Sequence, residues 1–154
     1  MADYFLDSSA IVKRYINETG SAFVDGLIDP AQQANNIFIV EITRAEIASA
    51  FARREKGKTL APQDAATARA AFAKDVTNVY AIVAVPPELI THAADLATRH
   101  VLRGYDSVQL AAALAANRDI TAGGHGVMTF VSADGDLNLA AVAEGLAVEN
   151  PNDH

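Results

Sequence analysis

Four acidic residues stand where apolar runs end or where helices are expected to begin. Asp7 directly follows the run YFL at 4–6, and Asp134 ends the run GVMTFVSAD at 126–134. If both runs are parallel strands, their carboxyl ends meet at one edge of the sheet, where open α/β folds place their ligands. Two further acids in the first turns of expected helices can line the same edge, namely Glu46 and Asp106.

A cluster of carboxylates has a specific chemical consequence. Like charges repel at short distance, so four acids at one edge require either bound protons or a cation. Carboxylate oxygens are the hard ligands that Mg²⁺ and Mn²⁺ prefer, and such an ion can activate a bound water. The sequence therefore predicts a site for Mg²⁺ or Mn²⁺. In the absence of the ion, the same negative pocket suits an arginine side chain from a partner protein.

Each acid also has an ordinary structural explanation. Asp7 can cap the helix expected to begin near Ala10, and Asp106 can be a first-turn acid favoured by the helix dipole. Glu46 can be a solvated helix residue, with Glu41 as a competing acid in the preceding strand. Spacing alone leaves these alternatives open.

An alternating pattern of strands and helices positions the acids. Apolar runs rich in β-branched residues predict strands, and apolar positions at helical spacing predict the helices between them. Thr43 is expected to cap one helix and Gly57 to end it. The expected strands are 4–7, 36–42, 79–85 and 126–134, with an edge strand at 146–148, and the expected helices are 10–15, 20–29, 43–56, 62–76, 86–101, 103–118 and 137–145. This order predicts an α/β fold with a central parallel sheet of four to five strands flanked by helices.

Composition narrows the class of protein. The chain has 154 residues, 51% of them hydrophobic, which is enough to bury the core of one domain, expected to span residues 1–154. There is no cysteine, which excludes a disulfide framework, a thiolate zinc site and a cysteine nucleophile. The first residues lack the basic region of a signal peptide, and no apolar run approaches the roughly 20 residues that cross a bilayer. We therefore expect a cytoplasmic protein with no membrane association.

Charge is unevenly distributed along the chain. The formal net charge of −7 argues against general nucleic-acid binding, which needs lysine and arginine. Basic residues nevertheless gather in the first half, and they form either a local face for phosphate contacts or ordinary solvated helix faces. They are Lys13, Arg14, Arg44, Arg53, Arg54, Lys56 and Lys58. Arg103 and Tyr105, just before Asp106, have the same two explanations.

Four stretches carry, in order and across nearly the whole chain, a resemblance to a known family. They are YFLDSSAIVKRY, TRAEIASAF, LRGYDSVQLAAAL and TFVSADGDLNLAAVAEGLAVENP. They resemble the motifs of PIN-domain proteins, most of all the VapC-type toxins of bacterial toxin–antitoxin pairs. The resemblance implies a small α/β nuclease fold and Mg²⁺- or Mn²⁺-dependent cleavage of RNA. It also implies silencing by a cognate VapB-like antitoxin and assembly as a homodimer.

The resemblance also assigns roles to individual residues. Ser9 matches the hydroxyl residue that orients the first acid, and Ser132 stands where relatives often have Thr or Ser before the last acid. Asp136 lies two residues after Asp134 and can share its role. We favour Asp134, because the strand is expected to end there and Asp136 to cap the next helix. The implied catalytic and metal-binding residues are Asp7, Glu46, Asp106 and Asp134.

Two other functions stay open at this point. A haloacid-dehalogenase-like phosphatase also begins with a strand that ends on Asp, but its chemistry needs a second acid two residues later, where this chain has Ser9. A catalytically silent PIN-like binding module would carry the same motifs without turnover. An RNA cleavage assay with and without metal separates the nuclease from the silent module.

Overall fold

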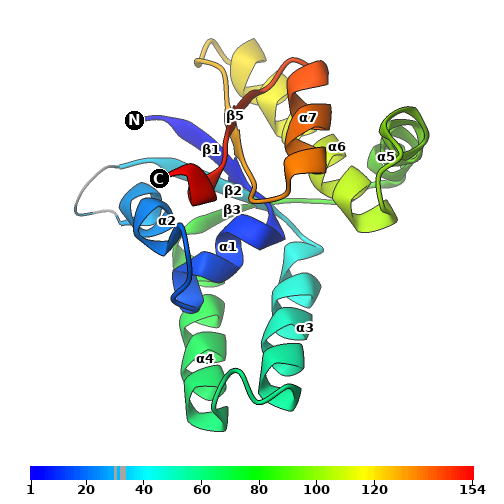
Figure 1. The fold of residues 1–154 in the computed structure, drawn as a ribbon. Coiled ribbons are helices and arrows are strands. Elements are labelled where there is room, and N and C mark those ends of the chain that lie inside the picture. Colours follow the sequence, from blue (N-terminus) through cyan, green and yellow to red (C-terminus); the bar gives the residue numbers. More distant parts are fainter. Residues whose placement is uncertain (30, 32–33) are drawn as a thin grey trace.

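The computed structural model describes residues 1–29, 31 and 34–154, and a parallel sheet of five strands forms its centre (Figure 1). The strand order is β3-β2-β1-β4-β5, and every neighbouring pair is parallel. The strands are β1 (Asp3–Leu6), β2 (Asn36–Val40), β3 (Tyr80–Val83), β4 (Thr129–Val131) and β5 (Ala147–Glu149). The predicted α/β fold with a parallel sheet of four to five strands is therefore confirmed.

Helices join the strands and cover both faces of the sheet (Figure 1). In chain order they are α1 (Ser8–Tyr15), α2 (Ser21–Ile28), α3 (Thr43–Lys56), α4 (Pro62–Asn78), α5 (Pro87–His100), α6 (Gly104–Ala122), α7 (Gly135–Ala143) and the short 3₁₀ helix η1 (Pro151–Asp153). Among the described residues, none of these helices is long and apolar enough to cross a membrane.

Each face of the sheet has its own hydrophobic core, because successive strand residues point to opposite faces. Phe5 and Phe130 lie on one face, with 5.8 Å between their ring centroids, and pack with α5, α6 and α7. The next residues along, Leu6 and Val131, lie on the other face and pack with residues of α1 to α4. The neighbouring strands β1 and β4 are thus buried on both faces of the sheet, which explains their continuous apolar sequence.

Helix α3 has the predicted bounds but not the predicted cap. It runs from Thr43 to Lys56, and Gly57 follows its last turn. The capping position is Ile42, which offers no side-chain hydrogen bond, so the prediction that Thr43 caps the helix is wrong. Thr43 is instead buried, and its Oγ1 accepts a hydrogen bond from Gln109 Nε2 at 3.1 Å. Figure 1 shows α3 and α4 extending together beyond the sheet.

The predicted fourth strand is too long at its carboxyl end. β4 stops at Val131, three residues before the expected end at Asp134. Ser132 N still donates to the carbonyl of Glu149 at 3.2 Å, but its hydroxyl accepts from Asp134 N at 3.0 Å and turns the chain toward α7. Asp134 therefore belongs to the connection between β4 and α7.

Candidate active site

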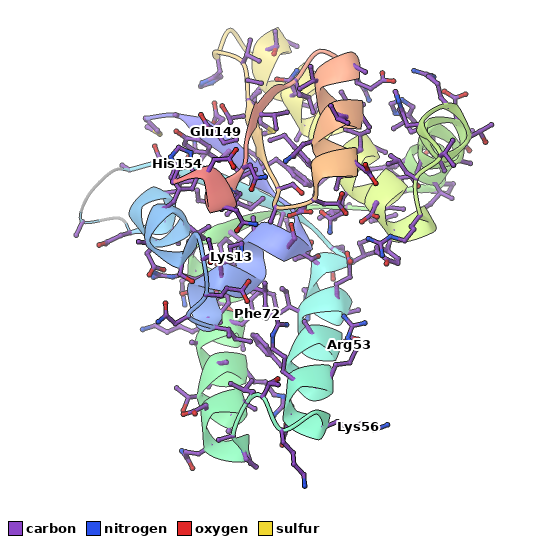
Figure 2. The ribbon with its side chains drawn as sticks, in the orientation of Figure 1. Lys13, Arg53, Lys56, Phe72, Glu149 and His154 are labelled. Atoms are coloured by element: carbon purple, nitrogen blue, oxygen red, sulfur yellow. The ribbon has the colours of Figure 1, made fainter. Side chains whose placement is uncertain are left out.

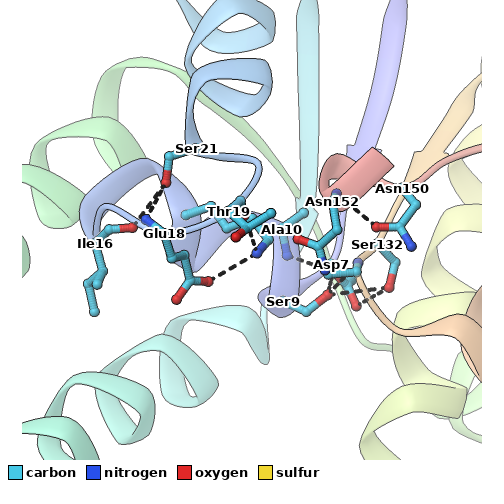
Figure 3. A network of polar contacts seen from close by, with 12 residues as sticks. Asp7, Ser9, Ala10, Ile16, Glu18, Thr19, Ser21, Ser132, Asn150 and Asn152 are labelled. Atoms are coloured by element: carbon cyan, nitrogen blue, oxygen red, sulfur yellow. Dashed lines mark hydrogen bonds and ion pairs between the residues drawn. The ribbon is translucent and has the colours of Figure 1, made fainter. Parts of the chain in front are cut away.

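Asp7 lies where β1 ends and α1 begins, and both oxygens of its carboxylate accept hydrogen bonds (Figure 3). Oδ1 accepts from Ala10 N at 3.0 Å and from Ser9 Oγ at 2.7 Å, and Oδ2 accepts from Ser132 Oγ at 2.8 Å. The residue is 4% exposed. Burial raises its pKa from 3.8 to about 6, although the hydrogen bonds from Ser9, Ser132 and Ala10 work in the opposite direction.

Two serines connect the ends of the neighbouring strands β1 and β4. Besides bonding Asp7, Ser9 Oγ accepts from Ala133 N at 2.9 Å and lies 3.3 Å from Ser132 Oγ. Ser132 is completely buried. These contacts fix the orientation of Asp7. The resemblance implied this role for Ser9, whereas the contact of Ser132 with Asp7 comes from the structure alone.

Glu46 lies in the first turn of α3 and is held by a glutamine from α6. Gln109 Nε2 donates to Glu46 Oε1 at 2.8 Å and also lies 3.0 Å from Ser8 Oγ. Burial raises the pKa of Glu46, and the hydrogen bond from Gln109 partly offsets this. Asp106 adds to the rise because it is a second negative charge nearby.

Gln109 is a pocket residue outside the set of site residues predicted from the sequence. It is 1% exposed, and its Oε1 is a buried polar atom with no hydrogen-bond partner among the residues that the structure describes. The available signal was its position, because it lies one helical turn after Asp106 on an otherwise apolar, alanine-rich helix. A polar residue in such a stripe requires partners, and Glu46 supplies one.

Arg103, just before α6, bridges the two remaining acids. Its Nε donates to Asp106 Oδ2 at 3.0 Å, and its Nη2 lies 3.4 Å from Asp134 Oδ2. The guanidinium is 5.0 Å from the ring centroid of Tyr105, and the side chain remains 65% exposed. Burial raises the pKa of Asp106, with Arg103 acting in the opposite direction. The chain therefore places one of its own arginines where we expected the arginine of a partner.

Asp134 caps α7, which corrects the assignment of Asp136. Oδ1 of Asp134 accepts from Asp136 N at 3.0 Å and from Leu137 N at 3.1 Å, while Oδ2 faces Arg103. Asp136 lies in the first turn of the helix and does not cap it. The prediction that Asp136 is the cap is wrong, because the helix begins two residues earlier than expected.

All four acids line one pocket of about 520 Å³, together with Ser9, Gln109 and Arg103 among others. Each acid stands at the amino-terminal end of a different helix, as the cap of α1 or α7 or in the first turn of α3 or α6. The positive end of each helix dipole favours a carboxylate there, whereas burial and mutual repulsion disfavour it. The capping explanation and the functional explanation of Asp7 and Asp134 are therefore compatible.

The side chains of the pocket have the right chemistry for a divalent cation, but its acids are not grouped closely around one point. Its donors are carboxylate oxygens, which are the hard ligands of Mg²⁺ and Mn²⁺. Within the described part of the chain, however, no three His, Cys, Asp or Glu side chains are grouped closely enough to hold an ion. Arg103 takes an oxygen of both Asp106 and Asp134, so a cation would have to displace it.

Several solved structures are similar to this chain along most of its length. No curated protein matches the chain. Among solved structures, VapC20 of Mycobacterium tuberculosis, a sarcin-ricin loop cleaving toxin, has a TM-score of 0.63 and 17% identity over 94% of this chain and 97% of its own. PAE2754 of Pyrobaculum aerophilum has a TM-score of 0.64 and 16% identity, with 99% of this chain and 85% of that one covered. VapBC2 of Rickettsia felis, bound to a DNA fragment from its promoter, has a TM-score of 0.62 and 16% identity, covering 96% and 97%.

The TM-scores of 0.62 to 0.64 show that these structures share the fold of this chain, and a family model covers most of the sequence. The model of the PIN domain matches residues 4–144, a range that contains all four acids of the pocket and both serines that bind Asp7. The chain therefore belongs to the PIN-domain family.

Proposed function

We propose that this chain is a metal-dependent endoribonuclease and the toxin of a toxin–antitoxin pair. The observation that carries the proposal is the convergence of four carboxylates, from four helix starts, in one pocket of a PIN fold. Solved neighbours that include a toxin cleaving the sarcin-ricin loop support the choice of RNA as substrate. The PIN-domain match also gives no support to a haloacid-dehalogenase-like phosphatase.

The residues of the pocket have distinct tasks in this proposal. A divalent cation held by Asp7, Glu46, Asp106 and Asp134 would activate a water and stabilise negative charge on the phosphate. Ser9, Ser132 and the Ala10 amide hold Asp7 in one orientation, so its carboxylate does not have to reorganise. Gln109 holds Glu46 in the same way, through its hydrogen bond to Oε1.

The test is an RNA cleavage assay with a matched pair of variants. Mixed transfer and ribosomal RNAs are incubated with the chain and Mn²⁺ or Mg²⁺, with EDTA as the metal-free control. Asp106→Asn should reduce cleavage by about 100-fold or more, because it removes one charge from the pocket. Asp64→Asn, at an exposed first-turn acid of α4, should leave cleavage unchanged. Equal rates for both variants would contradict the assignment.

One observation favours a second candidate, a catalytically silent binding module. Arg103 neutralises Asp106 and Asp134 in the absence of metal, and a permanent bridge of this kind would keep a cation out. The same assay decides between the candidates. A wild-type chain that cleaves none of the RNAs with either metal would favour the silent module.

We further propose that a small antitoxin silences the chain with an arginine in the pocket. The support is that the pocket already binds a guanidinium between two of its carboxylates. Co-expression with the neighbouring gene product, followed by Mn²⁺ titration of RNA cleavage, tests this. Activity in the intact complex equal to that of the free chain would refute it.

The homodimer that the resemblance implies stays a prediction, which analytical ultracentrifugation of the purified chain checks.

A further inference from the structure

The structure divides the basic residues of the first half into paired and free side chains. Lys13 is buried and donates to Glu18 at 3.1 Å and to the carbonyl of Thr19 at 2.8 Å. Arg14 pairs with Asp25 at 2.9 Å. These two residues stabilise the packing around α1, so the expectation that they contact phosphates finds no support.

The remaining candidates lie on α3 and just after it. Arg54 pairs with Glu18 at 3.3 Å, and Arg44 pairs with a glutamate in the preceding connection. Arg53 and Lys56 differ from both, because neither makes an ion pair or hydrogen bond with any residue that the structure describes. Figure 2 shows both side chains on the outer side of α3, directed away from α4.

Arg53 and Lys56 share one face of α3 with the acid of the pocket. At 100° per residue, Glu46, Ser49, Arg53 and Lys56 fall within about 80° of one another around the helix axis. The first three of them line the pocket. With a rise of about 1.5 Å per residue, Arg53 lies about 10 Å and Lys56 about 15 Å along the helix from Glu46. A stripe of positive charge therefore leads out of the acidic pocket along α3.

We propose that Arg53 and Lys56 bind the RNA backbone beside the cleaved phosphate, so that the strand leaves the pocket along the outer face of α3. This inference rests on the proposed nuclease function. The acidic pocket repels RNA, so cations at its rim are needed to hold the strand there. Arg103 is already shared between Asp106 and Asp134, whereas Arg53 has its donors free for a phosphate.

The position of Arg53 predicts which kinetic constant it affects. Because it lies about 10 Å along α3 from Glu46, it contacts nucleotides that flank the reacting phosphate. A flanking contact is equally strong in the ground state and the transition state, so its loss raises KM and leaves kcat unchanged. Arg53 is therefore a substrate-binding residue and takes no part in the chemical step.

The experiment measures how RNA binding depends on salt. A fluorescein-labelled single-stranded RNA of mixed sequence is bound by the full chain carrying Asp7→Asn, in EDTA and a series of KCl concentrations. Loss of one phosphate contact should lower the slope of log K against log salt by about 0.7 and weaken binding about fivefold near 0.1 M salt. Arg53→Gln should show this loss, and Arg53→Lys should largely keep the slope.

Arg118→Gln is the matched control, because Arg118 is an exposed arginine without a pairing partner in the described part of the chain. It lies near the other end of α6, about 18 Å along the helix from Asp106. Equal slopes for the Arg53→Gln and Arg118→Gln chains would overturn the inference, as would RNA binding too weak to detect in the parent. Unchanged RNA binding with weaker binding of the neighbouring gene product would instead assign the stripe to a protein partner. Failure of the nuclease proposal is recognised separately. It would appear as a wild-type chain that does not cleave RNA, and the binding slopes described here would still be measurable.

Discussion

Replacing Asp7 by Asn should stabilise the fold at neutral pH. In the folded chain the pKa of Asp7 is about 6, against an ordinary value of 3.8, because the carboxylate is buried. The folded state thus binds the proton more tightly than the unfolded state does. The stability that this contributes is fully present below pH 3.8 and is lost as the pH rises through about 6.

The size of the effect follows from the shift in pKa. A shift of about two units, at about 1.4 kcal/mol per unit, corresponds to about 3 kcal/mol. Above pH 6 the wild type carries this cost, and the neutral Asn does not. Asn keeps the cap of α1 through Oδ1, and its amide can donate to the hydroxyl of Ser132. Asp7→Asn should therefore exceed the wild type in stability by up to about 3 kcal/mol well above pH 6.

Urea unfolding of both chains across the acid to neutral range, with EDTA present, measures this difference. The difference in free energy of unfolding, Asp7→Asn minus wild type, should rise between pH 3.8 and about 6 and then level off. Asp64→Asn is the control, because Asp64 is exposed, and its difference curve should be flat. A constant difference for Asp7→Asn at every pH, or a variant less stable than the wild type at neutral pH, would refute the reasoning.

Three further predictions address the pocket and the fold. Arg103→Gln should raise the affinity for Mn²⁺ a few-fold in isothermal titration, because it releases two carboxylate oxygens; an unchanged affinity would show that the bridge does not compete with metal. Gly20→Ala should lower the free energy of unfolding by about 2 to 4 kcal/mol, measured with urea, because a left-handed backbone is strained for Ala. The structure supports this with a φ of +87° at Gly20, where an added Cβ would lie only 2.6 Å from the carbonyl oxygen of Pro151. Asp134→Ala should lose RNA cleavage and about 1 kcal/mol of stability, because it removes both the acid and the cap of α7. Asp134→Asn should lose cleavage alone, since Asn can still cap the helix, and Asp136→Ala should change neither property. Melting curves measured beside cleavage assays separate these outcomes.

The sequence predicts the elements of this fold well where local signals are strong. Helix 43–56 is reproduced to the residue, because a glycine follows its last turn. The expected strand 126–134 is too long, because Ser132 and Ala133 carry no signal that stops a strand, whereas the backbone already turns toward α7 after Val131. Periodicity reports which residues are buried, and Ser132 is buried outside the strand, so burial alone does not fix the strand end.

The candidate site shows a similar division. The convergence of Asp7 and Asp134 follows from parallel topology, because both lie in the connections that leave the carboxyl ends of the neighbouring strands β1 and β4. The roles of Gln109 and Arg103 do not follow from it, because each depends on a contact between elements far apart in sequence. Gln109 reaches Glu46 across 63 positions, and Arg103 reaches Asp134 across 31. No local pattern encodes such contacts.

The negative charges of the four acids in the pocket are stabilised in three different ways. Asp7 receives hydroxyl and amide hydrogen bonds and has a raised pKa, Glu46 receives the amide of a buried glutamine, and Asp106 and Asp134 share a guanidinium. The first two means are buried and fixed, because they depend on residues in the core of the fold. The guanidinium is on a side chain that is 65% exposed and can swing into solvent. Binding of a cation would therefore rearrange the contacts of Asp106 and Asp134, while Asp7 and Glu46 keep their orientation. Arg103 is thus the side chain most able to control whether a cation occupies the pocket.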